Sequence, residues 1–166
     1  RTAVQSMDFA RVSESADGLS NRAETWFYET PAIGQLPVVD IDLMFSPAFD
    51  LDELDGLREL AHELQHMWRL GNWIITWERE VHEGDFTAGI FVEARDQEIV
   101  SEAELEAVKR QQLDPEVIVQ RINDSGLIDQ FVADWKRRRD GLRRQDLGLE
   151  SVEKDRIIDD IERLMQ

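Results

Sequence analysis

Cysteine is absent from this chain of 166 residues, and its absence removes several kinds of site at once. The protein has no disulfide scaffold, no cysteine-ligated zinc, no iron–sulfur cluster and no cysteine nucleophile. Histidine and carboxylate side chains are therefore the strong zinc ligands that remain. The chain has only three histidines, and all of them fall between residues 62 and 82.

Long apolar runs are also missing. No run approaches the roughly 20 residues that a membrane span needs, and the first 18 residues lack the apolar centre of a signal peptide. We therefore expect no membrane association and a cytoplasmic location.

Positive charge is scarce, because 19 Lys and Arg face 36 Asp and Glu, for a net charge of −17. A surface this acidic repels phosphates and disfavours general nucleic-acid binding. One basic cluster departs from this trend and predicts a local nucleic-acid contact; the alternative is a solvated helix face that pairs with the chain's own acids. The cluster comprises Lys136, Arg137, Arg138, Arg139, Arg143 and Arg144.

Hydrophobic periodicity predicts an α+β fold that is mostly helical. The segment 25–30 is aromatic, and 38–45 alternates apolar and polar residues, so together they predict a small β-sheet or hairpin. Apolar residues at helical spacing follow from 51 to 70 and predict a helix that ends at Gly71. The segment 73–81 fits either a helix or a strand. Further helices are expected over 86–100, from Ser101, from Asp114-Pro115, over 127–144 and over 151–165. We expect an arm at 1–24, a core at 25–100 and a helical extension at 101–166.

The motif that carries chemistry is His62-Glu63-Leu64-Gln65-His66, an H-E-x-x-H sequence. Residues four apart share a helix face, so two imidazoles converge on one metal ion. Zinc lowers the pKa of its bound water, and the glutamate takes the proton as that water attacks a carbonyl. The pattern predicts a Zn²⁺ site on His62 and His66, with Glu63 as general base.

Catalytic zinc needs a third protein ligand. His82 follows His66 by 16 residues, and Glu93 lies on the expected helix after Phe86. Glu78, Glu80 and Asp85 are further alternatives. The motif does not continue as H-x-x-G-x-x-H, which argues against a metzincin.

Residues 38–86 resemble the core of the SprT-like (Spartan-type) zinc peptidases. The resemblance rests on Ile41–Phe45, the acidic stretch 50–55, Leu57–Trp68 and His82–Phe86, with Glu83 in place of the family's glycine. It implies a zincin-like fold and His82 as third ligand. The competing gluzincin resemblance takes Glu93 instead.

These patterns predict a zinc metallopeptidase acting on a protein or peptide substrate. Two alternatives stay open: a noncatalytic structural or assembly module, for example a viral component, that keeps a zincin-like fold, and an acidic adaptor that binds a basic partner.

Overall fold

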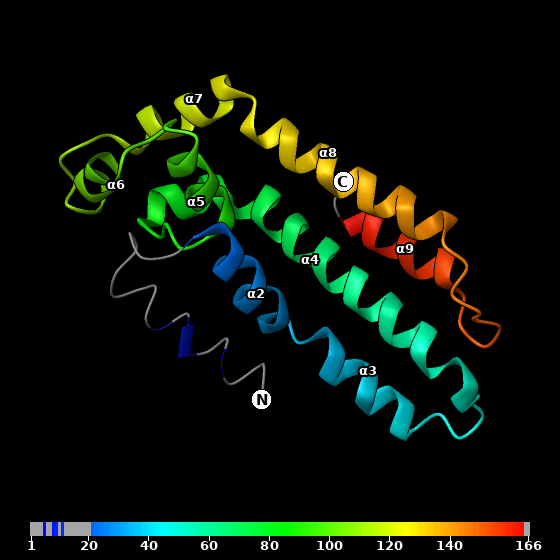
Figure 1. The fold of residues 1–166 in the computed structure, drawn as a ribbon. Helices are drawn as coiled ribbons and strands as arrows, with labels where there is room; N and C mark the ends of the chain where they lie inside the picture. The colour runs from blue at the N-terminus through cyan, green and yellow to red at the C-terminus, as the bar shows by residue number, and fades with distance from the viewer. Residues whose placement is uncertain (1–4, 6–7, 10, 12–20, 165–166) are drawn as a thin grey trace.

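The computed structural model describes residues 5, 8–9, 11 and 21–164, and within these ranges it contains helices but no β-strand. Most of the arm predicted at 1–24 lies outside them. The labels follow Figure 1, and the elements are α2 (Arg22–Ala32), α3 (Gln35–Met44), the short 3₁₀-helix η2 (Leu51–Glu53), α4 (Leu54–Glu83), α5 (Gly89–Asp96), α6 (Glu102–Lys109), α7 (Pro115–Ser125), α8 (Leu127–Arg144) and α9 (Lys154–Leu164).

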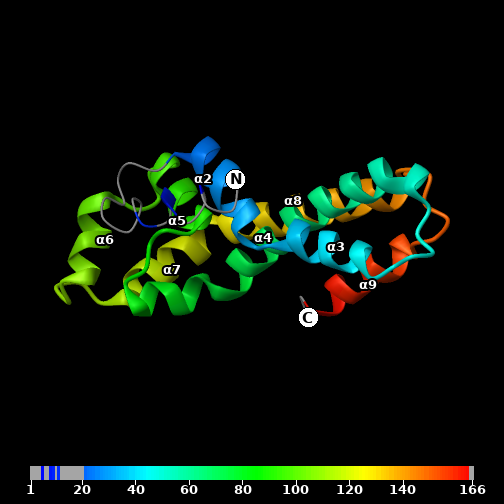
Figure 2. The same cartoon turned by 90° about the horizontal axis from the view of Figure 1, so that it is seen from below.

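Helix α4 runs through the middle of the structure (Figure 1). Helices α2 and α3 follow one side of it, and α8 and α9 follow the other. The short helices α5, α6 and α7 gather at one end, while α3 and α9 lie at the opposite end (Figures 1 and 2). With 30 residues, α4 is about 45 Å long.

One hydrophobic core joins these layers. Leu60, Leu64, Met67, Leu70, Trp73 and Trp77 of α4 belong to it, together with buried side chains from α5, α6, α7, α8 and α9. Trp135 of α8 is buried, and its indole Nε1 donates a hydrogen bond to the Met67 carbonyl oxygen of α4 at 3.1 Å. Residues of the predicted core at 25–100 and of the predicted extension at 101–166 both contribute to this cluster.

The predicted β-hairpin is wrong, because 25–30 lies inside α2 and 38–45 forms most of α3 and its C-cap. Asn21 caps α2 by accepting a hydrogen bond from the Glu24 amide at 3.0 Å. In α3 the residues that pack on the core are Val39 and Leu43, four apart, whereas Ile41 is exposed. The alternating segment therefore also contains two apolar residues at helical spacing, and their packing on the core favours the helix over a strand.

The predicted helix end at Gly71 is also wrong. Gly71 is buried within α4, and the helix continues to Glu83, where Gly84 ends it in the left-handed conformation (φ 73°). A helical glycine costs only about 1 kcal/mol relative to alanine. Burial of Trp73, Trp77 and Val81 beyond it stabilises the continued helix by more than that.

The C-terminal half follows the predictions closely. Ser101 and Glu104 form the expected capping box, and Asp114 with Pro115 begins α7. Helix α8 spans Leu127–Arg144 as expected. The helix predicted over 86–100 is shorter, because Asp85 bonds the Thr87 amide and hydroxyl in a turn and α5 begins only at Gly89.

Candidate functional site

The H-E-x-x-H motif occupies the first half of α4, so His62 and His66 lie one turn apart on one face as predicted. His62 is exposed, whereas His66 is half-buried beside Trp26 of α2, with 5.6 Å between the ring centroids. The Nδ1 atom of His66 is buried and has no hydrogen-bond partner within the described part of the chain. The motif thus places two imidazoles one turn apart, and a zinc site would need further ligands.

Burial lowers the pKa of His66, and the nearby Arg138 guanidinium lowers it further, while Glu63 opposes the shift. The neutral imidazole is therefore favoured. This is the form that binds metal ions.

Glu63, the predicted general base, forms an ion pair with Arg138 of α8, in which Nη1 and Oε2 lie 3.3 Å apart. Arg138 also lies over the Trp26 ring, 5.6 Å from its centroid, and 3.8 Å from Asp134. The carboxylate is thus held by a neighbouring cation. The ion pair engages Oε2, so Oε1 is the atom that would accept a proton from a water.

The structure does not bring His82 to the other two histidines. All three lie on α4, and the 16 residues between His66 and His82 correspond to about 24 Å along the axis. His82 instead pairs with Glu116 of α7, with 3.4 Å between Nε2 and Oε1. The continuation of α4 beyond Gly71 causes this separation.

Glu93 is not brought to the histidine pair either. It lies on α5, where Gln97 Nε2 donates a hydrogen bond to its Oε1 at 2.9 Å. Glu78 and Glu80 lie on α4, 12 and 14 residues beyond His66, or about 18 and 21 Å along the axis. Within the described residues, no three His, Asp or Glu side chains are grouped so that they could hold a metal ion.

Several arginines of the basic cluster are engaged by the chain's own carboxylates. Arg139 pairs with Asp140 and Glu162, and Arg143 pairs with Asp159 at 2.6 Å and with Glu162 at 2.9 Å. The pairs with Asp159 and Glu162 connect α8 to α9, and all of these pairs offset positive charge that a phosphate backbone would need.

A second polar face lies in the other half of α4, from which the sequence analysis considered Glu80 only as an alternative zinc ligand. Asn72, Thr76 and Glu80 are spaced by four residues and so occupy one face on successive turns. The Thr76 hydroxyl donates a hydrogen bond to the Asn72 carbonyl oxygen at 2.7 Å. The signal was the N-x-x-x-T-x-x-x-E spacing, but a helix that ended at Gly71 could not present it.

Glu80 has an environment unlike that of a solvated surface acid. Burial raises its pKa, and the nearby Asp85 raises it further, while hydrogen bonding with Thr76 opposes the shift. Its Oε2 atom is buried and lacks a hydrogen-bond partner among the described residues. A carboxylate in this state gains stability when a cation binds beside it.

Gln65 belongs to the same face, because it precedes Asn72 by seven residues, or two turns. At about 100° per residue, Gln65, Asn72, Thr76 and Glu80 fall within an arc of about 80°. Gln65 is 3% exposed, and its Oε1 likewise has no hydrogen-bond partner in the described chain. Buried oxygens without a partner are uncommon in folded proteins, so this face of α4 is a candidate for binding a water or a ligand.

Comparison of the chain with protein-family models, with curated proteins and with solved structures gives no match. Among the described helices, none combines the length and apolar character required to cross a membrane.

Proposed function

We propose that Thr76 and Glu80 of α4 bind a divalent cation of the magnesium type. The observation that carries this proposal is the buried Oε2 of Glu80, which has no partner among the described residues and lies one turn after the Thr76 hydroxyl. Hydroxyl and carboxylate oxygens are hard donors, which Mg²⁺ and Mn²⁺ prefer over the nitrogen and sulfur ligands that suit zinc.

The small number of protein oxygens at this site favours a substrate that itself binds the cation. Two protein oxygens leave most of an octahedral shell to water or substrate, and Mg²⁺ commonly combines one or two carboxylates with substrate phosphates. A chain of charge −17 repels free phosphate, so a bound cation would supply the missing attraction. We therefore propose a metal-assisted enzyme whose substrate carries phosphate or diphosphate groups.

Arg69 supports the same proposal, because it precedes Asn72 by three residues and so lies on this face of α4. It is partly buried. A guanidinium can bind phosphate oxygens in a bidentate manner, and together with the cation it would offset charge that develops on a leaving phosphate.

Substitution of Glu80 tests the site. We expect Glu80→Gln to weaken Mg²⁺ and Mn²⁺ binding by at least about tenfold, because it removes the only carboxylate of the set. Isothermal titration calorimetry with each cation, in the presence and absence of inorganic diphosphate, measures the loss.

The matched control is Glu78→Gln, which removes the same charge from an exposed position of the same helix. This variant should keep the wild-type affinity, and diphosphate should strengthen cation binding to it. Equal losses in both variants, or wild-type protein that binds neither cation at millimolar concentration, would contradict the proposal.

A second candidate function is the zinc peptidase suggested by the H-E-x-x-H motif. The juxtaposition of exposed His62 with the buried, partnerless Nδ1 of His66 in the described chain favours it. His62 and His66 would hold zinc, Glu63 would take the proton of the bound water, and a group other than His82 would complete the site.

Zinc analysis of purified variants tests this candidate. We expect about one equivalent of zinc in the wild type and its loss in His62→Ala, because a single imidazole cannot retain the ion. His82→Ala is the control and should keep the zinc, since His82 lies about 24 Å along α4 from His66. Glu63→Gln should keep the metal but lose peptide cleavage. A wild type without zinc, or equal loss in His62→Ala and His82→Ala, would exclude this arrangement.

A further inference from the structure

Helix α3 carries apolar side chains on two faces. Val39 and Leu43 pack on the core, and Figure 1 shows α3 at the edge of the structure with α4 beside it. On the other face, four large apolar side chains are between 52% and 80% exposed: Val38, Ile41, Met44 and the C-cap residue Phe45. At about 100° per residue these four fall within an arc of about 120°, which we call the outer stripe of α3. Helices with apolar residues on opposite faces are usually covered on both, so the outer stripe indicates an interaction surface.

An aspartate borders the outer stripe on each side. By the same geometry, Asp40 lies about 40° beyond Met44, and Asp42 lies about 40° beyond Val38. Both aspartates are exposed, and neither forms an ion pair within the described chain. The stripe is therefore an apolar surface with a negative charge along either edge.

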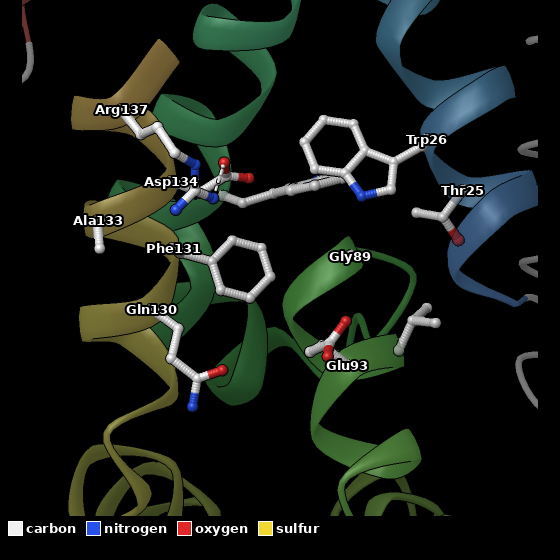
Figure 3. A pocket seen from close by; sticks show the side chains of 11 residues that line it. Thr25, Trp26, Gly89, Glu93, Gln130, Phe131, Ala133, Asp134 and Arg137 are labelled. Atoms are coloured by element: carbon white, nitrogen blue, oxygen red, sulfur yellow. Dashed lines mark hydrogen bonds and ion pairs between the residues drawn. The ribbon is translucent and has the colours of Figure 1, made fainter. Parts of the chain in front are cut away.

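No cation in the neighbouring sequence offsets this charge. Residues 23–57 include eight Asp and Glu but no Lys, Arg or His. Several acids elsewhere are paired by the chain's own arginines: Arg137 lies 2.6 Å from Asp134 beside the pocket shown in Figure 3, and Arg143 lies 2.6 Å from Asp159. The surface at α3 thus differs from the rest of α8 and α9, because its charge is left for a basic partner to complement.

A hollow of about 250 Å³ adjoins α3 at Asp42. It lies between α3, α4 and the start of α9, and its lining includes Val39, Leu43, Phe49, Leu60, Asp42 and Ser46. Large apolar side chains that fill such hollows contribute much of the binding energy when a helix docks on a protein surface. The Ser46 hydroxyl is already engaged by the Asp42 carbonyl oxygen at 2.8 Å, which leaves the Asp42 carboxylate as the polar group at this edge.

We infer that α3 docks an amphipathic helix of a partner protein, whose apolar stripe is bordered by Lys or Arg. The partner's apolar side chains would cover the outer stripe, with one of them in the hollow, and its cations would lie against Asp40 and Asp42. A second copy of this chain is disfavoured, because a symmetric contact would place the same aspartates against each other. An anionic lipid surface is disfavoured for the same electrostatic reason.

The test measures binding of labelled helical peptides to the full chain by fluorescence anisotropy. One peptide of about five turns carries a leucine stripe with Lys along both edges, a second has Glu in place of Lys, and a third has the composition of the first in scrambled order. We expect the Lys-edged peptide to bind at least about tenfold more tightly than either of the others, and added salt to weaken it. Equal binding of the Lys-edged and scrambled peptides would show only attraction to an acidic chain and would overturn the inference. Absence of binding at millimolar peptide would overturn it too.

Ile41→Gln locates the contact on α3. It should weaken binding of the Lys-edged peptide by at least about fivefold, because Ile41 lies within the outer stripe. The matched control is Ile75→Gln, which makes the same change on α4 at a residue that is 61% exposed, against 54% for Ile41. The control should keep the wild-type affinity, and an equal loss in both variants would place the contact elsewhere.

Asp40→Asn combined with Asp42→Asn tests the bordering charges. This double variant should bind the Lys-edged peptide severalfold more weakly and with a smaller dependence on salt. The control is Asp124→Asn combined with Asp129→Asn, which removes the same charge from exposed positions of α7 and α8, away from α3. Losses of the same size in both double variants would contradict the assigned role of Asp40 and Asp42.

Sedimentation velocity of the wild type separates a partner helix from a second copy. We expect no dimer held by α3. A dimer that Ile41→Gln dissociates would show that a second copy covers the outer stripe, and it would overturn the inferred partner.

Discussion

A Trp135→Ala variant is expected to lose about 3–5 kcal/mol of unfolding free energy, the usual cost of removing a buried tryptophan. Trp135 is 5% exposed and fills the interface between α4 and α8. Its removal leaves a cavity and also deletes the hydrogen bond from Nε1 to the Met67 carbonyl oxygen. Urea unfolding followed by circular dichroism measures the change, and an unaltered m-value shows that unfolding stays two-state.

Trp135→Phe separates the two contributions. Phenylalanine fills most of the space but cannot donate the hydrogen bond, so we expect a loss of only about 1–2 kcal/mol. Loss of less than about 1 kcal/mol in the alanine variant would mean that the α4–α8 interface does not pack as described.

Gly89→Ala is expected to destabilise the protein by about 1–3 kcal/mol, although alanine is the better helix former. A Cβ atom on Gly89 would lie 2.5 Å from Cη2 of Trp73 and 2.7 Å from two more atoms of the same ring. Trp73 is itself buried, with 2% of its surface exposed, so the ring cannot swing into solvent. Thermal and urea unfolding measure the loss.

A double-mutant cycle with Trp73→Phe provides the control for Gly89→Ala. The smaller ring vacates the space that the new methyl group needs, so the cost of Gly89→Ala should shrink when it is combined with Trp73→Phe. Additive costs for the two substitutions would contradict the close contact between Gly89 and Trp73.

Sequence reasoning succeeded where local chemistry determines structure. The Ser101–Glu104 capping box and the Asp114-Pro115 helix start depend on side chains that bond the adjacent backbone, and both are present. Sequence reasoning failed where a segment fits both the alternation of a β-strand and the spacing of a helix, because packing then selects the structure. Residues 38–45 alternate, yet Val39 and Leu43 are the pair that reaches the core.

The candidate sites depended on a different error, the helix end predicted at Gly71. The one-turn spacing of His62 and His66 was predictable because residues four apart in any helix lie on the same face. The position of His82 depends on whether the helix continues beyond Gly71. The local sequence does not show that it continues, because packing elsewhere in the core is what allows a glycine inside α4. In the continuous helix, His82 lies far from His62 and His66, and Asn72, Thr76 and Glu80 lie on one face.

The length of α4 determines how much of the protein unfolds together. One uninterrupted helix contributes side chains to the core along most of its length, and every later helix packs into that same core. Local unfolding of one end would expose apolar surface held in common with the other helices. The described chain should therefore open as a single cooperative unit, and slow hydrogen exchange should extend along α4 on both sides of Gly71.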